Sequence, residues 1–92
     1  MYLPEQIQLT PQGLELKVSS YFVDGAIPSA ELCSIRNDIL YGTFRVRLAL
    51  PLVPGTCTGF FYYLNDWTEI DFEFLSSFVA NENRPMAFTG IQ

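Results

Sequence analysis

The stretch WTEIDFEF at residues 67–74 decides how this sequence is interpreted. Successive side chains of a β-strand point to opposite faces of the sheet. A strand over these residues places three acids in a row on one face, with a tryptophan at the head of the row: Glu69, Asp71, Glu73 and Trp67. The apolar residues point to the other face, into a core: Ile70, Phe72 and Phe74.

The acid row has a functional and a structural interpretation. Like charges on neighbouring positions of one sheet face repel one another and weaken the strand. A folded protein tolerates such a row where the carboxylates have a task, and paired carboxylates beside an aromatic residue suggest glycoside chemistry. The alternative is an ordinary amphipathic strand whose acidic face lies in solvent.

Composition limits the class of protein. The chain has 92 residues, enough for one small domain, and 49% of them are hydrophobic, which excludes a charge-rich disordered chain. The net charge of −5, with only five basic residues, argues against nucleic-acid binding. No apolar run approaches 18 residues, so we expect no membrane span, and residues 1–6 do not resemble a secretory signal.

The chain contains no histidine. This excludes Ser-His-Asp and Cys-His nucleophiles and every histidine-based metal site, and two cysteines cannot form a four-cysteine zinc site. Acid–base chemistry therefore falls to carboxylates, tyrosine or lysine. We name no metal ligand and no cofactor, and the sequence leaves a structural calcium site open. Cys33 and Cys57 form either a disulfide or two buried thiols.

Apolar and polar residues alternate with period two in most of the chain, as in residues 14–18, 43–50 and 58–63. Turn signals separate these runs at Pro11-Gln12-Gly13, Asp24-Gly25, Asn37-Asp38, Pro54-Gly55 and Asn65-Asp66. The pattern predicts an all-β, antiparallel sandwich or barrel. Five or six amphipathic strands need a second sheet to cover them, so the chain is expected to be part of a larger sandwich. The alternative is a small sheet that self-associates through its uncovered face.

Residues 35–77 resemble glycoside hydrolase family 16, the β-glucanase group. The matching runs are residues 36–47, 55–63 and 65–66, followed by the acid motif Glu69-Ile70-Asp71-Phe72-Glu73 in the uninterrupted form of the family signature. The run Ala30-Glu31-Leu32 is similar to the segment that precedes them in the family. The resemblance implies a concanavalin A-like lectin/glucanase jelly roll, present here as a partial domain over residues 1–92 with its motif-bearing part at 30–77.

The resemblance implies a retaining mechanism with two carboxylates. Glu69 would be the nucleophile, and Glu73 the general acid and then the general base. Asp71 would orient Glu69 by a hydrogen bond and keep Glu73 protonated by its charge. Retention requires carboxyl groups about 5–5.5 Å apart, whereas Cα atoms four residues apart on a strand are separated by about 13 Å. The two glutamates must therefore lean toward each other on a rigid sheet.

Aromatic and basic residues are expected to bind the sugar. Trp67 matches a tryptophan that lies against the donor-side sugar in some family members, and Arg47 matches an arginine on the neighbouring strand. Phe61 and Tyr63 share one strand face and Phe60 and Tyr62 the other, and the sequence leaves open which pair lines the cleft. The sequence departs from the family pattern at Arg45, where some mixed-linkage glucanases carry a sugar-binding glutamate. This difference puts mixed-linkage β-glucan in doubt as the substrate.

The expected partner is a β-glucan polysaccharide or oligosaccharide, and the family implies an extracellular or cell-wall location. A glycan-binding jelly roll without catalysis is one alternative. An inactive truncated remnant is another, because no second half of the fold is recognisable after Ser77.

Overall fold

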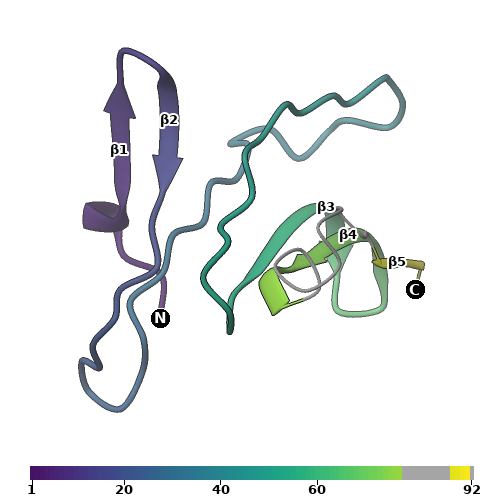
Figure 1. Ribbon diagram of the computed structural model, residues 1–92. Coiled ribbons are helices and arrows are strands. Elements are labelled where there is room, and N and C mark those ends of the chain that lie inside the picture. Colours follow the sequence, from purple (N-terminus) through teal and green to yellow (C-terminus); the bar gives the residue numbers. More distant parts are fainter. Residues whose placement is uncertain (78–87, 92) are drawn as a thin grey trace. The chain divides into compact units, whose positions relative to one another are not determined.

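The computed structural model describes residues 1–77 and 88–91 of the chain. After a short 3-10 helix, Pro4–Gln6, five strands follow in the order β1 (Ile7–Thr10), β2 (Gly13–Leu16), β3 (Cys57–Asn65), β4 (Thr68–Leu75) and β5 (Phe88–Ile91) (Figure 1). β1 pairs with β2, and β4 lies between β3 and β5, always antiparallel. The predicted all-β, antiparallel class is therefore confirmed.

The chain divides into two compact units, Met1–Arg36 and Asn37–Gln92. Among the described residues, the first unit holds the two-stranded sheet and the second unit the three-stranded sheet. The expected motif-bearing part, residues 30–77, crosses the boundary between the units, and its assignment to one partial domain over residues 1–92 stays a prediction.

The first unit contains the β1–β2 hairpin. Its two-residue turn, Pro11-Gln12, lies where the sequence predicts it. The Thr10 hydroxyl accepts a hydrogen bond from the Gln12 N–H at 3.2 Å and donates one to the Gly13 carbonyl at 3.0 Å. Gly13 follows the turn at φ 138°, a conformation that residues with a Cβ rarely adopt.

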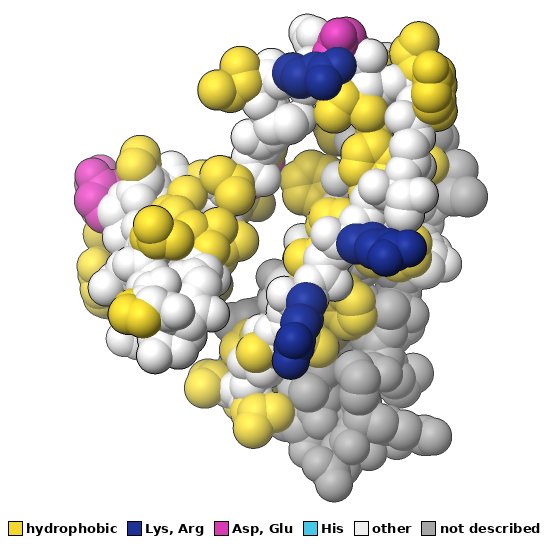
Figure 2. All heavy atoms as spheres, turned by 90° about the horizontal axis from the view of Figure 1, so that it is seen from above, with side chains coloured by type: hydrophobic (Ala, Val, Ile, Leu, Met, Phe, Trp, Pro, Cys, Tyr) yellow, Lys and Arg dark blue, Asp and Glu magenta, His cyan; other side chains and the backbone are white. Residues whose placement is uncertain are grey.

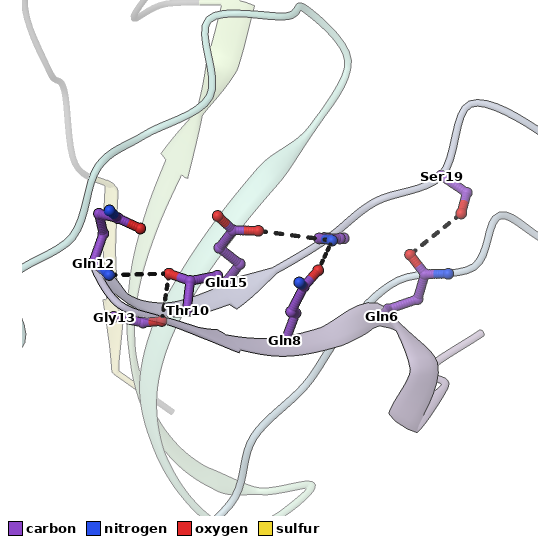
Figure 3. Close-up of polar contacts among 8 residues, drawn as sticks. Gln6, Gln8, Thr10, Gln12, Gly13, Glu15 and Ser19 are labelled. Carbon is purple, nitrogen blue, oxygen red and sulfur yellow. Dashed lines mark hydrogen bonds and ion pairs between the residues drawn. The ribbon is translucent and has the colours of Figure 1, made fainter.

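The two faces of this hairpin differ in polarity. The register pairs Ile7 with Leu16 and Leu9 with Leu14 on one face, and Gln8 with Glu15 on the other. The polar face continues beyond the strands, as Figure 3 shows. There Lys17 Nζ lies 3.7 Å from the Glu15 carboxylate and donates a hydrogen bond to the Gln8 amide oxygen, while the Ser19 hydroxyl lies 3.3 Å from the Gln6 amide oxygen. Charge on the polar face is therefore neutralised locally.

Two further contacts order the first unit. Val23 and Ala26 exchange backbone hydrogen bonds around the predicted turn at Asp24-Gly25, where both residues have positive φ, 50° and 79°. Ser29 bonds through its backbone to the Met1 carbonyl and the Leu3 N–H, at 2.8 and 3.0 Å. The adjacent Pro28 is fully buried. Residues 1–3 are thus hydrogen-bonded to Ser29, which follows the turn at Asp24-Gly25.

The second unit is built on the β3–β4 hairpin, whose two-residue turn is Asp66-Trp67. Asn65 Oδ1 accepts the Trp67 backbone N–H at 2.9 Å, which is the local bond that makes asparagine favourable at turns. The register shifts between Tyr63 and Asn65, so one residue of β3 has no counterpart on β4. Such a bulge redirects the side chains around it.

Ser76 closes the open end of the same hairpin. Its side chain is only 1% exposed, and its hydroxyl accepts the Thr56 N–H at 3.0 Å. The Ser76 N–H in turn donates to the Thr56 carbonyl, also at 3.0 Å. The start of β3 is therefore tied to the end of β4 by two hydrogen bonds to one residue.

The apolar face of this sheet is partly covered by residues 39–44. The register pairs Phe60 with Phe72 and Tyr62 with Ile70 on this face. The Tyr62 hydroxyl donates to the carbonyl of Ile39, and the Phe44 ring meets the Tyr62 ring edge-on at 5.9 Å. The cover is incomplete, because Ile70 and Phe72 remain 44% and 42% exposed. Apart from Pro28, no apolar side chain among residues 1–77 and 89–90 is buried, and hydrophobic side chains are spread over the face shown in Figure 2.

Two expectations are wrong. Residues 43–50 are not assigned to a strand, although they alternate in polarity. Alternation decides which face a side chain takes, but a strand also requires backbone pairing with a neighbour. Cys33 and Cys57 are free and exposed, and are neither a disulfide nor buried thiols. Within the described ranges, no helix is long and apolar enough to cross a membrane.

Candidate active site

The acid row lies on β4 as the sequence predicts. Strand alternation brings Glu69, Asp71 and Glu73 to one face of the sheet. Glu69 and Asp71 are half-buried, and Glu73 is exposed. Because β4 is the central strand of its sheet, the row has a neighbouring strand on each side.

The register decides which aromatic pair accompanies the acids. Phe61 lies opposite Asp71, and Tyr63 opposite Glu69. Directly paired residues of an antiparallel ladder share a face, so these two rings lie on the acid face and Phe60 and Tyr62 on the other. Phe61 and Tyr63 therefore share the face of the acids, and their role in lining a sugar cleft stays a prediction.

Two glycines leave room beside the acids. Gly59 of β3 is the register partner of Glu73, and Gly90 of β5 is the partner of Asp71. A Cβ added at Gly90 would lie 3.8 Å from Asp71 Oδ2, and one added at Gly59 would meet the Phe61 ring at 3.6 Å. Neither position would clash, but any longer side chain there would lie over the carboxylates or the ring. The glycines therefore keep the acid row open toward solvent.

The electrostatics of the row centre on Glu69. The pKa of Glu69 is raised from its ordinary value of 4.5, first by a hydrogen bond shared with Asp71 and then by burial. The negative charges of Asp71, Asp66 and Glu73 raise this pKa further. Glu69 therefore favours its protonated form more than an isolated glutamate does.

The structure places Trp67 differently from the sequence prediction. The prediction puts this residue at the head of the strand, on the acid face, but it lies in the turn before β4. The register shift at the end of β3 and the hydrogen bond from the Trp67 N–H to Asn65 determine this position. Trp67 lies outside the strand, so strand alternation does not predict which way its side chain points. The indole is 86% exposed. Trp67 is therefore a neighbour of the acid row along the chain and available to a ligand.

Arg47 is not brought to the acids by any interaction among the described residues. Its side chain is exposed, and it forms no ion pair with the β4 carboxylates within that part of the chain. The nearby Phe44 contacts the apolar face of the sheet, opposite the acids.

Sequence reasoning missed Asp66. Its Oδ1 accepts a hydrogen bond from the Tyr63 hydroxyl at 2.5 Å, and its charge acts on Glu69. The same hydrogen bond raises the pKa of Tyr63 and keeps the phenol protonated. The signal in the sequence was the Asn65-Asp66 turn, since a tyrosine three residues before the aspartate can fold back over a tight turn.

In the described ranges, no group of three or more His, Cys, Asp or Glu side chains is arranged to hold a metal ion. What the site offers is a row of three carboxylates, flanked on β3 by two aromatic rings and paired with one glycine on β3 and another on β5. Such a surface can transfer protons and attack an electrophilic carbon while an apolar ligand face rests on the rings.

Comparison with known protein families assigns the chain. The family model for glycosyl hydrolases family 16 matches residues 2–86, which include both hairpins and the whole acid motif. No curated protein matches the chain. No solved structure matches it either. The jelly-roll fold of the family agrees with the antiparallel strands, and the chain belongs to glycosyl hydrolase family 16.

Proposed function

We propose that this protein hydrolyses the glycosidic bonds of a β-glucan with retention of configuration. Glu69 is the nucleophile, Glu73 the general acid and base, and Asp71 the residue that orients Glu69. The observation that carries the proposal is the acid row of Glu69, Asp71 and Glu73 on the central strand of the sheet, on a face that also bears two aromatic rings.

The first step requires two carboxyl groups in opposite protonation states. Glu73 gives its proton to the leaving glycosidic oxygen while the Glu69 carboxylate attacks the anomeric carbon and forms the glycosyl-enzyme. Glu69 must therefore be ionised at the moment of attack. The hydrogen bond with Asp71 is the first cause of the raised pKa of Glu69, and the same contact would orient the Glu69 carboxylate for attack.

The second step reverses these roles. Glu73, now ionised, takes a proton from a water molecule, and the resulting hydroxide displaces Glu69 from the anomeric carbon. Both displacements invert that carbon, so the product retains the configuration of the substrate. Gly59 lies opposite Glu73 and has no side chain to cover it, so the leaving group and then the water would approach Glu73 from this side.

The aromatic residues and the charge of the site indicate the substrate class. Phe61, Tyr63 and the exposed Trp67 offer apolar surfaces for the faces of sugar rings. The carboxylates of Asp66, Glu69, Asp71 and Glu73 form no ion pair with a basic residue in the described part of the chain. An uncharged glucan is therefore a better ligand than a sulfated or uronic-acid polysaccharide. From the family we further propose that Arg47 bonds the sugar and that the protein acts outside the cell or at the cell wall.

Replacement of Glu69 tests the catalytic proposal. Glu69→Gln removes the attacking oxygen anion with little change in size, and reducing-sugar release from β-1,3-glucan and mixed-linkage glucan should disappear. Glu15→Gln, on the polar face of the first hairpin, is the matched control and should keep full activity. Proton NMR of the products should show the β-anomer first. Turnover that persists in Glu69→Gln, or an α-anomer as first product, would contradict the mechanism.

The second candidate function is glycan binding without catalysis. The exposed Trp67 favours it, because an indole that is 86% exposed on a turn can stack on a sugar without help from the acids. Calorimetric titration with a β-glucan oligosaccharide separates the two functions. Binding without product formation, unchanged in Glu69→Gln, would favour the binding module.

A further inference from the structure

Tyr63 and Asp66 form a side-chain pair next to the acid row. Tyr63 lies directly opposite Glu69 on β3, and Asp66 lies in the turn that joins β3 to β4. The phenol donates to Asp66 Oδ1 at 2.5 Å, at the short end of the range for hydrogen bonds to a carboxylate. The pair spans the bulge between Tyr63 and Asn65, where the regular ladder is interrupted.

The turn itself restricts where the Asp66 side chain can go. Asn65 Oδ1 holds the backbone N–H of Trp67 at 2.9 Å, which fixes the peptide units on both sides of Asp66. Because the turn backbone is restrained by the Asn65 hydrogen bond and the Asp66 carboxylate accepts a hydrogen bond from the Tyr63 hydroxyl, Asp66 has little freedom to move away from the strand. Both restraints come from residues within three positions of Asp66, so they form together with the hairpin.

We propose that Tyr63 and Asp66 are a positioning pair for the nucleophile: the Tyr63 hydroxyl holds the Asp66 carboxylate at the Glu69 end of the acid row, and this held charge sets the pH at which Glu69 becomes able to attack. The inference rests on the proposed function, because it assigns Glu69 as nucleophile. It adds two residues that act through Glu69 and not on the substrate's reacting atoms.

The charges around Glu69 are all negative. Along β4 it faces Asp71 and Glu73, from the turn Asp66, and from β3 the phenol of Tyr63. β5 carries no titratable residue. Asp66 is the member of this set that lies outside the strand, so its distance from Glu69 depends on the Tyr63 hydrogen bond and not on strand geometry.

The direction of the effect follows from the sign of these charges. A negative charge near a carboxyl group disfavours its ionised form and raises its pKa. Removing the charge of Asp66 should lower the pKa of Glu69, so that Glu69 loses its proton at a lower pH. The acid limb of a rate profile, where activity is lost because the nucleophile is protonated, should then move to lower pH.

The same charge should favour the reaction once Glu69 is ionised. The anomeric carbon gains positive charge in the transition state, and a fixed anion nearby stabilises it. Removal of the Asp66 charge should therefore reduce the plateau rate by about threefold to tenfold, because the charge is close but partly in solvent.

The test is a titration of the 92-residue chain carrying ¹³C-labelled glutamate and aspartate carboxyl groups, without substrate. Asp66→Asn removes the charge but keeps an oxygen that can accept from Tyr63, and Tyr63→Phe removes only the hydroxyl. Both should move the Glu69 midpoint to lower pH, Asp66→Asn further. The double variant should move it no further than Asp66→Asn, because Tyr63 acts through Asp66. Asp66→Glu, which restores the charge, should return part of the shift.

Matched controls and a second readout complete the test. Tyr41→Phe removes an exposed phenol, and Asp24→Asn removes a carboxylate in the first unit; both should leave the midpoint unchanged. The pH profile of β-glucan hydrolysis should show the same shifts in its acid limb. A Glu69 midpoint that stays in place in Asp66→Asn, or shifts that simply add in the double variant, would overturn the inference.

The outcomes separate this inference from the proposed function. Hydrolysis that requires Glu69, with no change of midpoint in the Asp66 and Tyr63 variants, would leave the proposed function standing and reject the pair. Shifted midpoints in a chain that cleaves no glucan would support the pair and reject the proposed function. If Asp66→Asn fails to fold, Tyr63→Phe decides alone by the direction of its shift.

Discussion

The two hairpins of this protein are built alike and carry opposite kinds of polar face. Each joins two antiparallel strands through a two-residue turn, and each has one apolar and one polar face. The β1–β2 hairpin balances its polar face, since Lys17 bonds both Gln8 and Glu15. The β3–β4 hairpin instead aligns Glu69, Asp71 and Glu73 and opposes them with aromatic rings and a glycine.

This difference shows how a functional strand face can be told from a solvated one. A solvated face gains by pairing opposite charges, however little each exposed pair contributes. A face that keeps like charges adjacent loses stability, and the raised pKa of Glu69 records this repulsion together with the bond to Asp71. The first hairpin therefore provides matched controls for experiments on the second.

The largest expected effect comes from removing Glu73, the proposed general acid. Glu73→Ala should reduce glucan hydrolysis by about 10²- to 10⁴-fold, because the leaving oxygen then departs without a proton. A β-glucoside with a nitrophenol leaving group needs no protonation, so its glycosylation step should lose much less. Steady-state and burst kinetics on both substrates measure the difference. Equal losses on the two substrates would show that Glu73 is not the acid, and Glu15→Ala should change neither rate.

A smaller effect, on the free energy of unfolding, is expected from removing a serine hydroxyl that forms a hydrogen bond near either hairpin. Ser76→Ala leaves the N–H of Thr56 without its buried partner, which should reduce the free energy of unfolding by about 1–3 kcal/mol. Ser19→Ala removes a half-buried hydroxyl near the first hairpin and should cost about 0.5–1 kcal/mol. Urea denaturation followed by tryptophan fluorescence compares the two. A loss at Ser19 as large as that at Ser76 would contradict the role assigned to burial.

A modest effect is also expected on binding. Trp67→Ala should weaken the binding of a β-glucan oligosaccharide about threefold to tenfold, since one exposed ring contributes a single stacking surface. Leu9→Ala removes a comparably exposed apolar side chain, 81% exposed, from the first hairpin and should leave the affinity unchanged. Calorimetry measures both. An unchanged Kd in Trp67→Ala would exclude the indole from the sugar site.

Much of the site was predictable because strand alternation and turn chemistry are local. The period-two pattern of residues 69–74 predicted the acid row, and the turns at Pro11-Gln12 and Asp24-Gly25 followed from residues that favour such backbones. Residues 43–50 show where this reasoning ends, because pairing with a distant strand cannot be read from alternation. The family match supports the fold class and the family's chemistry, while the roles of individual residues stay predictions.

The differences at Asp66 and Trp67 have one physical cause. A one-residue bulge near the end of β3 interrupts the strand alternation from which the position of Trp67 was predicted. The same bulge lies between Tyr63 and Asp66, whose side chains form a hydrogen bond. The position of a bulge depends on how the two strands pair, which is information that neither strand carries alone. The same pairing decided that Phe61 and Tyr63 face the acids.

The exposed apolar side chains have a consequence for how this chain unfolds. Since Pro28 is the only apolar side chain that is buried among residues 1–77 and 89–90, unfolding brings little additional apolar area into water. Hydration of newly exposed apolar area is the source of the heat-capacity increment, ordinarily about 12–15 cal/mol/K per residue, and the denaturant m-value scales with the newly exposed surface. Both quantities should fall well below the values usual for a chain of 92 residues, giving a broad, weakly cooperative transition. A ligand or partner that covers the exposed faces would reveal itself first as a sharper melting curve.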